Sequence, residues 1–172
     1  MKKNVIMTSI VSSLLAPTLA VAKVNEPNET VIFDPSIKIK TPKASALKNV
    51  IEKAFKSLTS LNATDKDIAR LHSGDYLQYT DGKTLNYEDF VNHVKALQRD
   101  IKSLKIVIHD MIFDGNKVVT RHTAYGVKKD EKEIEVQVIA VIEIKDNKFI
   151  VCHELSHLIK GEETDRDIGS RD

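Results

Sequence analysis

The chain has 172 residues, and its 26 lysines and arginines nearly balance 25 acidic residues. A net charge this close to zero excludes the basic footprint that nucleic-acid binding or attraction to anionic membranes requires. The single cysteine, Cys152, excludes an intrachain disulfide, so the fold must be held together by its core.

The N-terminus has the features of a secretory signal. Lys2 and Lys3 form a short basic head, an apolar stretch follows, and Ala20-Val21-Ala22 is an A-x-A cleavage site. The apolar stretch is short for a bilayer span, and an uncleaved membrane anchor is the alternative interpretation. We expect cleavage after residue 22, a periplasmic or secreted protein of 150 residues, and no membrane span after processing.

The mature chain divides into three parts by composition. Residues 23–43 contain three prolines among polar residues, which predicts an extended leader. Residues 44–160 carry the periodic apolar patterns of one folded domain, which is an ordinary size for a single core. Residues 161–172 are polar, and we expect them to be a solvated tail or an arm that packs across a partner subunit.

Three helices are predicted in the first half of the domain. The first carries apolar residues at steps of three and four, namely Leu47, Val50, Ile51, Ala54, Phe55 and Leu58. Thr64 caps a short second helix that is expected to end at Gly74. Asn86 caps a third helix, whose apolar stripe is Phe90, Val91, Val94 and Leu97.

Strands dominate after Leu104. One strand is predicted earlier, at 75–80, and later ones at 106–113, 118–127, 134–144 and 149–159, separated by turns. In the strand at 118–126, alternation places Val118, Thr120, His122 and Ala124 on the inward face. Helices followed by antiparallel hairpins predict an α+β domain with the helices on one face of the sheet.

Three stretches resemble SnoaL-like domains of the nuclear-transport-factor-two-like superfamily. They are residues 75–82 with the helix that follows, 116–126 and 146–151, and the resemblance covers roughly residues 44–171. It implies three N-terminal-half helices packed on a strongly curved antiparallel sheet, a cone with an apolar pocket. Members include polyketide cyclases, ketosteroid isomerases, dehydratases and non-catalytic binding domains, so the fold alone does not select a function.

The resemblance also indicates where catalytic groups are missing. It matches the aspartates of the ketosteroid isomerases to Tyr79 and Ala140, neither of which is a carboxylate. It matches the Gln-His pair of the polyketide cyclases to Gln78 and Tyr79. Both departures argue against these activities and favour a binding domain.

Five polar residues are candidates for ligand contacts in the pocket: Tyr79, His93, Thr120, His122 and His153. The inward-facing His122 can exchange a proton near neutral pH, and Tyr79 can donate a hydrogen bond to a ligand carbonyl. A hydrogen-bonded structural histidine and a packed strand aromatic are the alternatives. The sequence does not decide which sheet face carries His109 and His153.

Residues 153–157, His-Glu-Leu-Ser-His, match the HExxH zinc motif. On a helix the two histidines would lie one turn apart and bind zinc, and Glu154 would activate water. We expect a strand instead, on which the two histidines stand roughly 13 Å apart, so no metal and no other cofactor is predicted. Cys152 points away from His153 on such a strand and is expected to be a buried, inert thiol.

Three functional hypotheses follow. The first is an exported domain that binds a small apolar or amphipathic ligand in its cone pocket. It is expected to be a homodimer through the outer sheet face, where Ile139 and Val141 are apolar. The second is a lyase, isomerase or cyclase-type enzyme that uses His122 and Tyr79. The third is the HExxH zinc metalloprotease.

Overall fold

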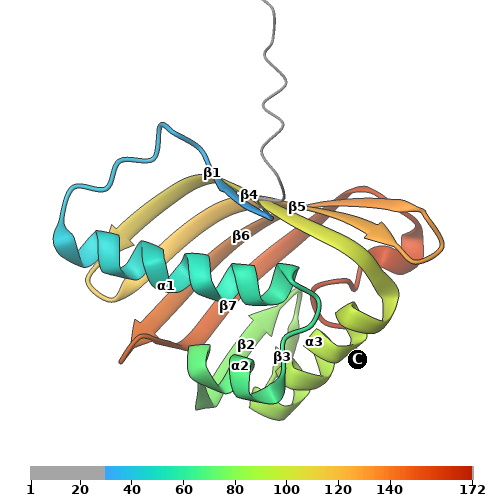
Figure 1. Ribbon diagram of the computed structural model, residues 1–172, viewed down its shortest axis with the longest axis horizontal. Coiled ribbons are helices and arrows are strands. Elements are labelled where there is room, and N and C mark those ends of the chain that lie inside the picture. Colours follow the sequence, from blue (N-terminus) through green and yellow to red (C-terminus); the bar gives the residue numbers. More distant parts are fainter. Residues whose placement is uncertain (1–29, 172) are drawn as a thin grey trace, which may run out of the picture.

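The computed structural model describes residues 30–171, which contain three α-helices, seven strands and one short 3-10 helix (Figure 1). The expected signal peptide, residues 1–22, lies outside these described residues. In chain order the elements are β1 (Val31–Phe33), α1 (Pro42–Thr59), α2 (Asp65–Leu71), β2 (His72–Thr80), β3 (Lys83–Leu85), α3 (Tyr87–Asp100), β4 (Ile101–Asp114), β5 (Lys117–Lys128), β6 (Glu133–Lys145), β7 (Lys148–Lys160) and the 3-10 helix Glu163–Asp165. Within the described range, no helix is both long enough and apolar enough to cross a bilayer.

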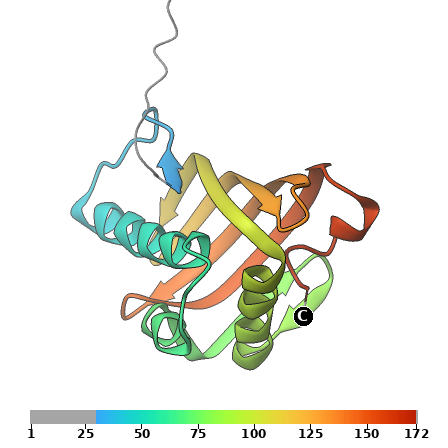
Figure 2. The ribbon, with the colours of Figure 1, turned by 45° about the vertical axis from the view of Figure 1, so that its right-hand side comes forward.

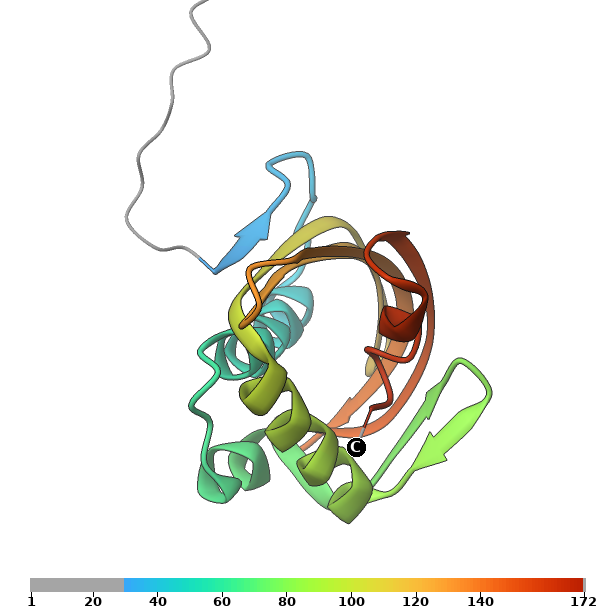
Figure 3. The same ribbon diagram turned by 90° about the vertical axis from the view of Figure 1, so that its right-hand side faces the viewer.

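The seven strands form one strongly curved sheet in the order β1-β4-β5-β6-β7-β2-β3. The α+β class is as predicted, but the sheet is mixed: β1 runs parallel to β4, and β2 runs parallel to β7. Both parallel pairs join strands that are separated by helices in the chain, as a parallel connection requires. Seen along its axis the sheet curls into a cone, with the β2–β3 hairpin splayed from its edge (Figure 3).

The second and third helices begin where the predicted capping residues, Thr64 and Asn86, place them. The side chain of Asn86 accepts hydrogen bonds from the backbone N–H groups of Glu88 and Asp89, and Asp89 completes a capping box. The second helix ends at Leu71, a few residues before the expected end at Gly74, because His72 leaves the helical conformation and starts β2. Gly74 therefore lies inside a strand and does not end the helix.

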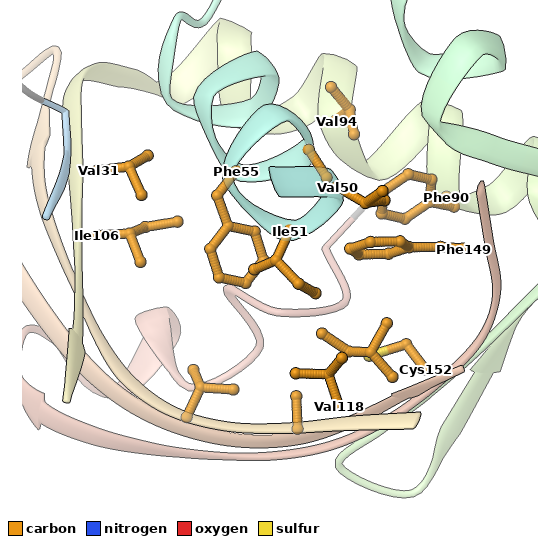
Figure 4. Close-up of a cluster of buried hydrophobic side chains, with 14 of the residues drawn as sticks. Val31, Val50, Ile51, Phe55, Phe90, Val94, Ile106, Val118, Phe149 and Cys152 are labelled. Carbon is orange, nitrogen blue, oxygen red and sulfur yellow. The ribbon is translucent and has the colours of Figure 1, made fainter. Parts of the chain in front are cut away.

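Helices α1 and α3 lie on the concave side of the sheet and bury their apolar faces against it (Figures 1 and 2). From α1, Ile51 is fully buried and Phe55 nearly so, facing Val118 of β5 and Cys152 of β7 (Figure 4). The strand β6 buries every second residue, as its alternation predicts: Ile134, Val136, Val138, Ala140, Ile142 and Ile144. Each fully buried large apolar side chain contributes about 1.5–3 kcal/mol.

Both ends of the domain differ from the expectation. Part of the predicted leader is integrated in the fold, because β1 pairs with β4 and buries Val31. The tail is not a free, solvated segment. Residues 161–171, called the C-terminal tail from here on, fold back across the cone of their own chain (Figure 3). Asp165 and Ser170 are buried there, although the segment is polar.

Candidate functional site in the cone cavity

A cavity of about 150 Å³ lies between the helices and the concave face of the sheet. Most of its lining is apolar and aromatic, from α1, α3 and the strands β4 to β7. The polar side chains that reach it are His72, Gln78, His93, His122, Glu154 and Ser156. An apolar cavity with a few converging polar groups is the usual form of a small-molecule site.

The strand β7 contributes a carboxyl group to this cavity, Glu154. It is in register with Ala140 of β6. Its Oε1 accepts a hydrogen bond of 2.9 Å from Nε2 of Gln78 on the neighbouring strand β2. The Tyr76 hydroxyl donates to Oε1 of Gln78 at 3.0 Å, so the amide group of Gln78 is held with its nitrogen towards Glu154. The positions to which the resemblance pointed, Tyr79 and Ala140, carry no carboxylate, but the cavity has one at Glu154, which the sequence suggested only as part of the HExxH motif.

The surroundings of Glu154 tune its proton affinity. Burial of the carboxyl group raises its pKa from 4.5 to about 7, and the negative charge of Asp81 acts in the same direction. The hydrogen bond from Gln78 opposes this rise. A carboxyl group with a pKa near the working pH is present in both protonation states and can accept or donate a proton.

The histidines in the cavity are poor bases. Burial lowers the pKa of His122 to about 4, and its Nδ1 lies 3.1 Å from Oγ1 of Thr120. His122 faces inward as predicted, but it is neutral near pH 7 and binds protons weakly there. Thr120 is buried behind it and does not itself line the cavity.

Two further histidines line the cavity. Burial lowers the pKa of His93, whose Nδ1 lies 2.9 Å from the carbonyl oxygen of Arg171 in the C-terminal tail. Burial lowers the pKa of His72 to about 4, and the ring packs between Tyr76, Phe90 and Phe149. His93 was a candidate from sequence, whereas His72 was not, because its place in a predicted helix concealed its facing.

Two sequence candidates lie outside the cavity. Tyr79 and His153 stack on each other on the outer face of the sheet, with ring centroids 4.6 Å apart and planes 8° from parallel. The expectation that these two residues line the cone pocket is wrong. Side chains alternate between the two faces of a strand, and the neighbouring residues Gln78 and Glu154 occupy the inward positions. His109 also faces outward, where its Nε2 lies 2.8 Å from Oγ1 of Thr123.

The HExxH residues lie on β7, as the strand prediction required. His153 and His157 are exposed and pair in register with Val141 and Gln137 of β6. The helical turn that brings two such histidines onto one zinc ion is not formed, which removes the structural basis of the metalloprotease hypothesis. The buried position of Cys152 is as predicted, and burial raises the pKa of its thiol.

Comparison with known proteins agrees with this architecture. A profile of the SnoaL-like domain matches residues 51–152. An uncharacterised protein of Schizosaccharomyces pombe is 30% identical over 120 residues, which cover 70% of this chain and 92% of the relative. The chain belongs to the SnoaL-like family.

Solved structures share the fold of this SnoaL-like domain at low sequence identity. IdmH of Streptomyces antibioticus, described as a candidate polyketide cyclase, has a TM-score of 0.56 at 13% identity and covers 64% of this chain and 91% of its own. An LEH-like epoxide hydrolase of M. tuberculosis has a TM-score of 0.57 at 14% identity, covering 66% and 84%. AclR of Streptomyces galilaeus, a candidate hydroxylase, reaches 0.60 at 10% identity, covering 74% and 87%.

Proposed function

We propose that this SnoaL-like domain binds a small, mostly apolar molecule in its cone cavity and exchanges a proton with it through Glu154. The observation that carries the proposal is the Glu154 carboxyl group, with a pKa of about 7, in an otherwise apolar cavity. A carboxyl group in such surroundings costs stability when it is charged, and groups of this kind cluster at functional sites. The neighbours named as a polyketide cyclase and an epoxide hydrolase are consistent with a small organic substrate.

The hydrogen bonds around Glu154 define how it would work. Gln78 donates to Oε1 at 2.9 Å, whereas the thiol of Cys152 is a weak donor to Oε2, at 3.8 Å. Oε2 is therefore the oxygen that is available to a substrate. In its charged form it takes a proton from a carbon or hydroxyl group, and the neutral form returns the proton to another atom of the same molecule. His122 stays neutral and contributes polarity, without acting as the base.

Hydrogen–deuterium exchange of cyclohexanone, a one-ring ketone, tests this proposal by proton NMR in D₂O. We expect the parent to accelerate exchange next to the carbonyl group, with a rate that rises through pH 7 as Glu154 loses its proton. Glu154→Gln should abolish the acceleration. Glu163→Gln is the matched control, because this glutamate has the same charge but is 81% exposed in the tail. Equal acceleration by the parent and Glu154→Gln would refute a role for Glu154.

Binding without catalysis is the second candidate, and the apolar lining of the cavity supports it independently of Glu154. Under this alternative, cyclohexanone would shift the NMR signals of residues that line the cavity, but the exchange rate would equal that of buffer. The two measurements on one sample therefore separate a binding domain from an enzyme.

We also propose that the protein is exported and that the mature chain forms a homodimer through the outer sheet face. The basic head, apolar stretch and A-x-A site in residues 1–22 support export. Exposed apolar residues on the outer face support the dimer: Ile139 is 51% and Leu155 is 71% exposed. Intact mass of the protein from its host tests cleavage, and analytical ultracentrifugation of Ile139→Lys beside the parent tests the dimer.

A further inference from the structure

The C-terminal tail forms one wall of the cavity. It leaves β7 at Gly161, passes through the 3-10 helix and reaches α3, crossing the open end of the cone (Figure 3). Ile168 and Gly169 of this tail line the cavity together with Glu154. The far end of the tail is attached to α3, where the Arg171 carbonyl oxygen lies 2.9 Å from Nδ1 of His93.

An ionic cluster holds the tail in this position. Asp165 is 1% exposed, accepts a hydrogen bond from the Glu162 backbone N–H at 2.8 Å, and pairs with Lys128 of β5 at 3.1 Å. Arg171, whose side chain is only 18% exposed, pairs with Asp167 at 2.8 Å and donates to the Thr164 carbonyl oxygen at 2.6 Å. Largely buried, paired charges favour one arrangement, because separating them leaves a charge without a partner.

The tail backbone passes directly over the carboxyl group that the proposed function uses. A Cβ atom at Gly169 would lie 3.4 Å from Oε1 of Glu154 and 3.2 Å from Oγ1 of Thr80. Any residue larger than glycine would therefore press on Thr80 or lift the tail, and would lie in contact with Glu154. The tail thus limits the space beside the Glu154 carboxyl group, and it also limits the volume of the cavity.

The volume that remains indicates the class of ligand. A cavity of about 150 Å³ matches the size of an engineered apolar cavity in another protein that holds benzene. A molecule of that size has one ring or a short chain. Glu154 and Gln78 together can bind one hydroxyl or carbonyl group of such a molecule. A fused-ring molecule is larger than this space and fits only if part of the wall moves, and Ile168 and Gly169 of the tail are part of that wall.

We propose that residues 161–171 are the size-selecting wall of this site, and that they restrict it to one-ring or short-chain molecules with one hydroxyl or carbonyl group. This inference rests on the proposed function, because it assumes that the cavity binds a ligand beside Glu154. It adds the substrate class and the segment that determines it.

Binding of phenol and 2-naphthol, one ring against two fused rings, tests the inference by isothermal titration calorimetry on the full chain. We expect the parent to bind phenol at least about tenfold more tightly, because a second ring overpacks the cavity. Arg171→Ala should loosen the tail and bring the two affinities within about threefold of each other. Arg166→Ala is the matched control, since its guanidinium is exposed and pairs with neighbouring Glu163, and should keep the parent's preference.

A second variant avoids the ionic cluster. Ile168→Ala removes a cavity-lining side chain of the tail and should also admit 2-naphthol, while circular dichroism confirms that each variant is folded.

Two results would overturn the proposal that the tail is a size-selecting wall and leave the proposed function standing. One is equal affinity of the parent for phenol and 2-naphthol, and the other is an unchanged preference for phenol in both Arg171→Ala and Ile168→Ala. Absence of phenol binding to the parent and all variants would instead overturn the proposed function and, with it, this inference.

Discussion

Replacing Glu154 by glutamine should stabilise the protein at pH 8 and leave its stability almost unchanged at pH 4. The unfolded chain releases the Glu154 proton near the ordinary pKa of 4.5, whereas the folded protein retains it up to about pH 7. Between these values the folded state binds more protons than the unfolded state, so its stability falls as pH rises. Glutamine has nearly the same shape and carries no charge, and therefore removes this loss.

The pKa difference sets the size of the effect. A tenfold difference in proton affinity corresponds to about 1.4 kcal/mol, so a rise from 4.5 to about 7 costs the charged, folded state roughly 3 kcal/mol. The hydrogen bond from Gln78 to Oε1 is available to glutamine as well, so little else changes at the site. The advantage of Glu154→Gln over the parent should therefore grow by roughly 3 kcal/mol between pH 4 and pH 8.

Urea denaturation of both proteins at a series of pH values measures this difference. With typical slopes for a chain of this size, the midpoint of Glu154→Gln should rise relative to the parent by roughly 1–3 M between pH 4 and pH 8. Glu163→Gln, which removes an equal charge from an exposed position, should show no such trend. A pH-independent difference between Glu154→Gln and the parent would show that the carboxyl group is not desolvated and would refute the reasoning.

Two further predictions concern His122 in the cavity and Gly161 at the start of the C-terminal tail. His122→Leu should be about 1–3 kcal/mol less stable than the parent at pH 7, because Thr120 Oγ1 loses its partner. Between pH 7 and pH 4 the difference should shift by roughly 3 kcal/mol in favour of His122→Leu, which cancels or reverses the deficit. The reason is that the parent's unfolded state takes up the His122 proton below pH 6.5 and its folded state only near 4; a constant difference in urea denaturation would contradict this. Gly161→Ala should cost about 1–2 kcal/mol in thermal denaturation, because φ is +148° and the new Cβ meets Leu158 at 3.1 Å. Gly74→Ala, with nothing within 4 Å, is its control, and an equal loss in both would refute the strain argument.

Much of the fold follows from local patterns that the sequence states directly. Alternation in 134–144 predicted which side chains of β6 enter the core, and the capping residue Asn86 predicted where α3 begins. The same alternation also contained an unused signal. If Cys152 is buried on a strand, then Glu154 two residues later shares its face and enters the cavity.

The composition of the site was decided by pairings between distant segments. Gln78 and Glu154 are 76 positions apart, and they meet because β2 adds to the edge of the sheet in parallel beside β7. No local pattern specifies such a partner, since the period of a strand determines which face a residue occupies but not which strand lies next to it.

The C-terminal tail is the clearest example of this limit. Its sequence is polar and predicts a solvated segment, yet its charges pair with Lys128 of β5 and Asp100 of α3 and hold it over the cavity. The sequence by itself determined the three helices, the five longer strands, the buried face of β6 and the family, but not the short strands β1 and β3. Tertiary structure alone decided which carboxyl group enters the pocket and how large the pocket is, because both depend on contacts between residues that are far apart in the chain.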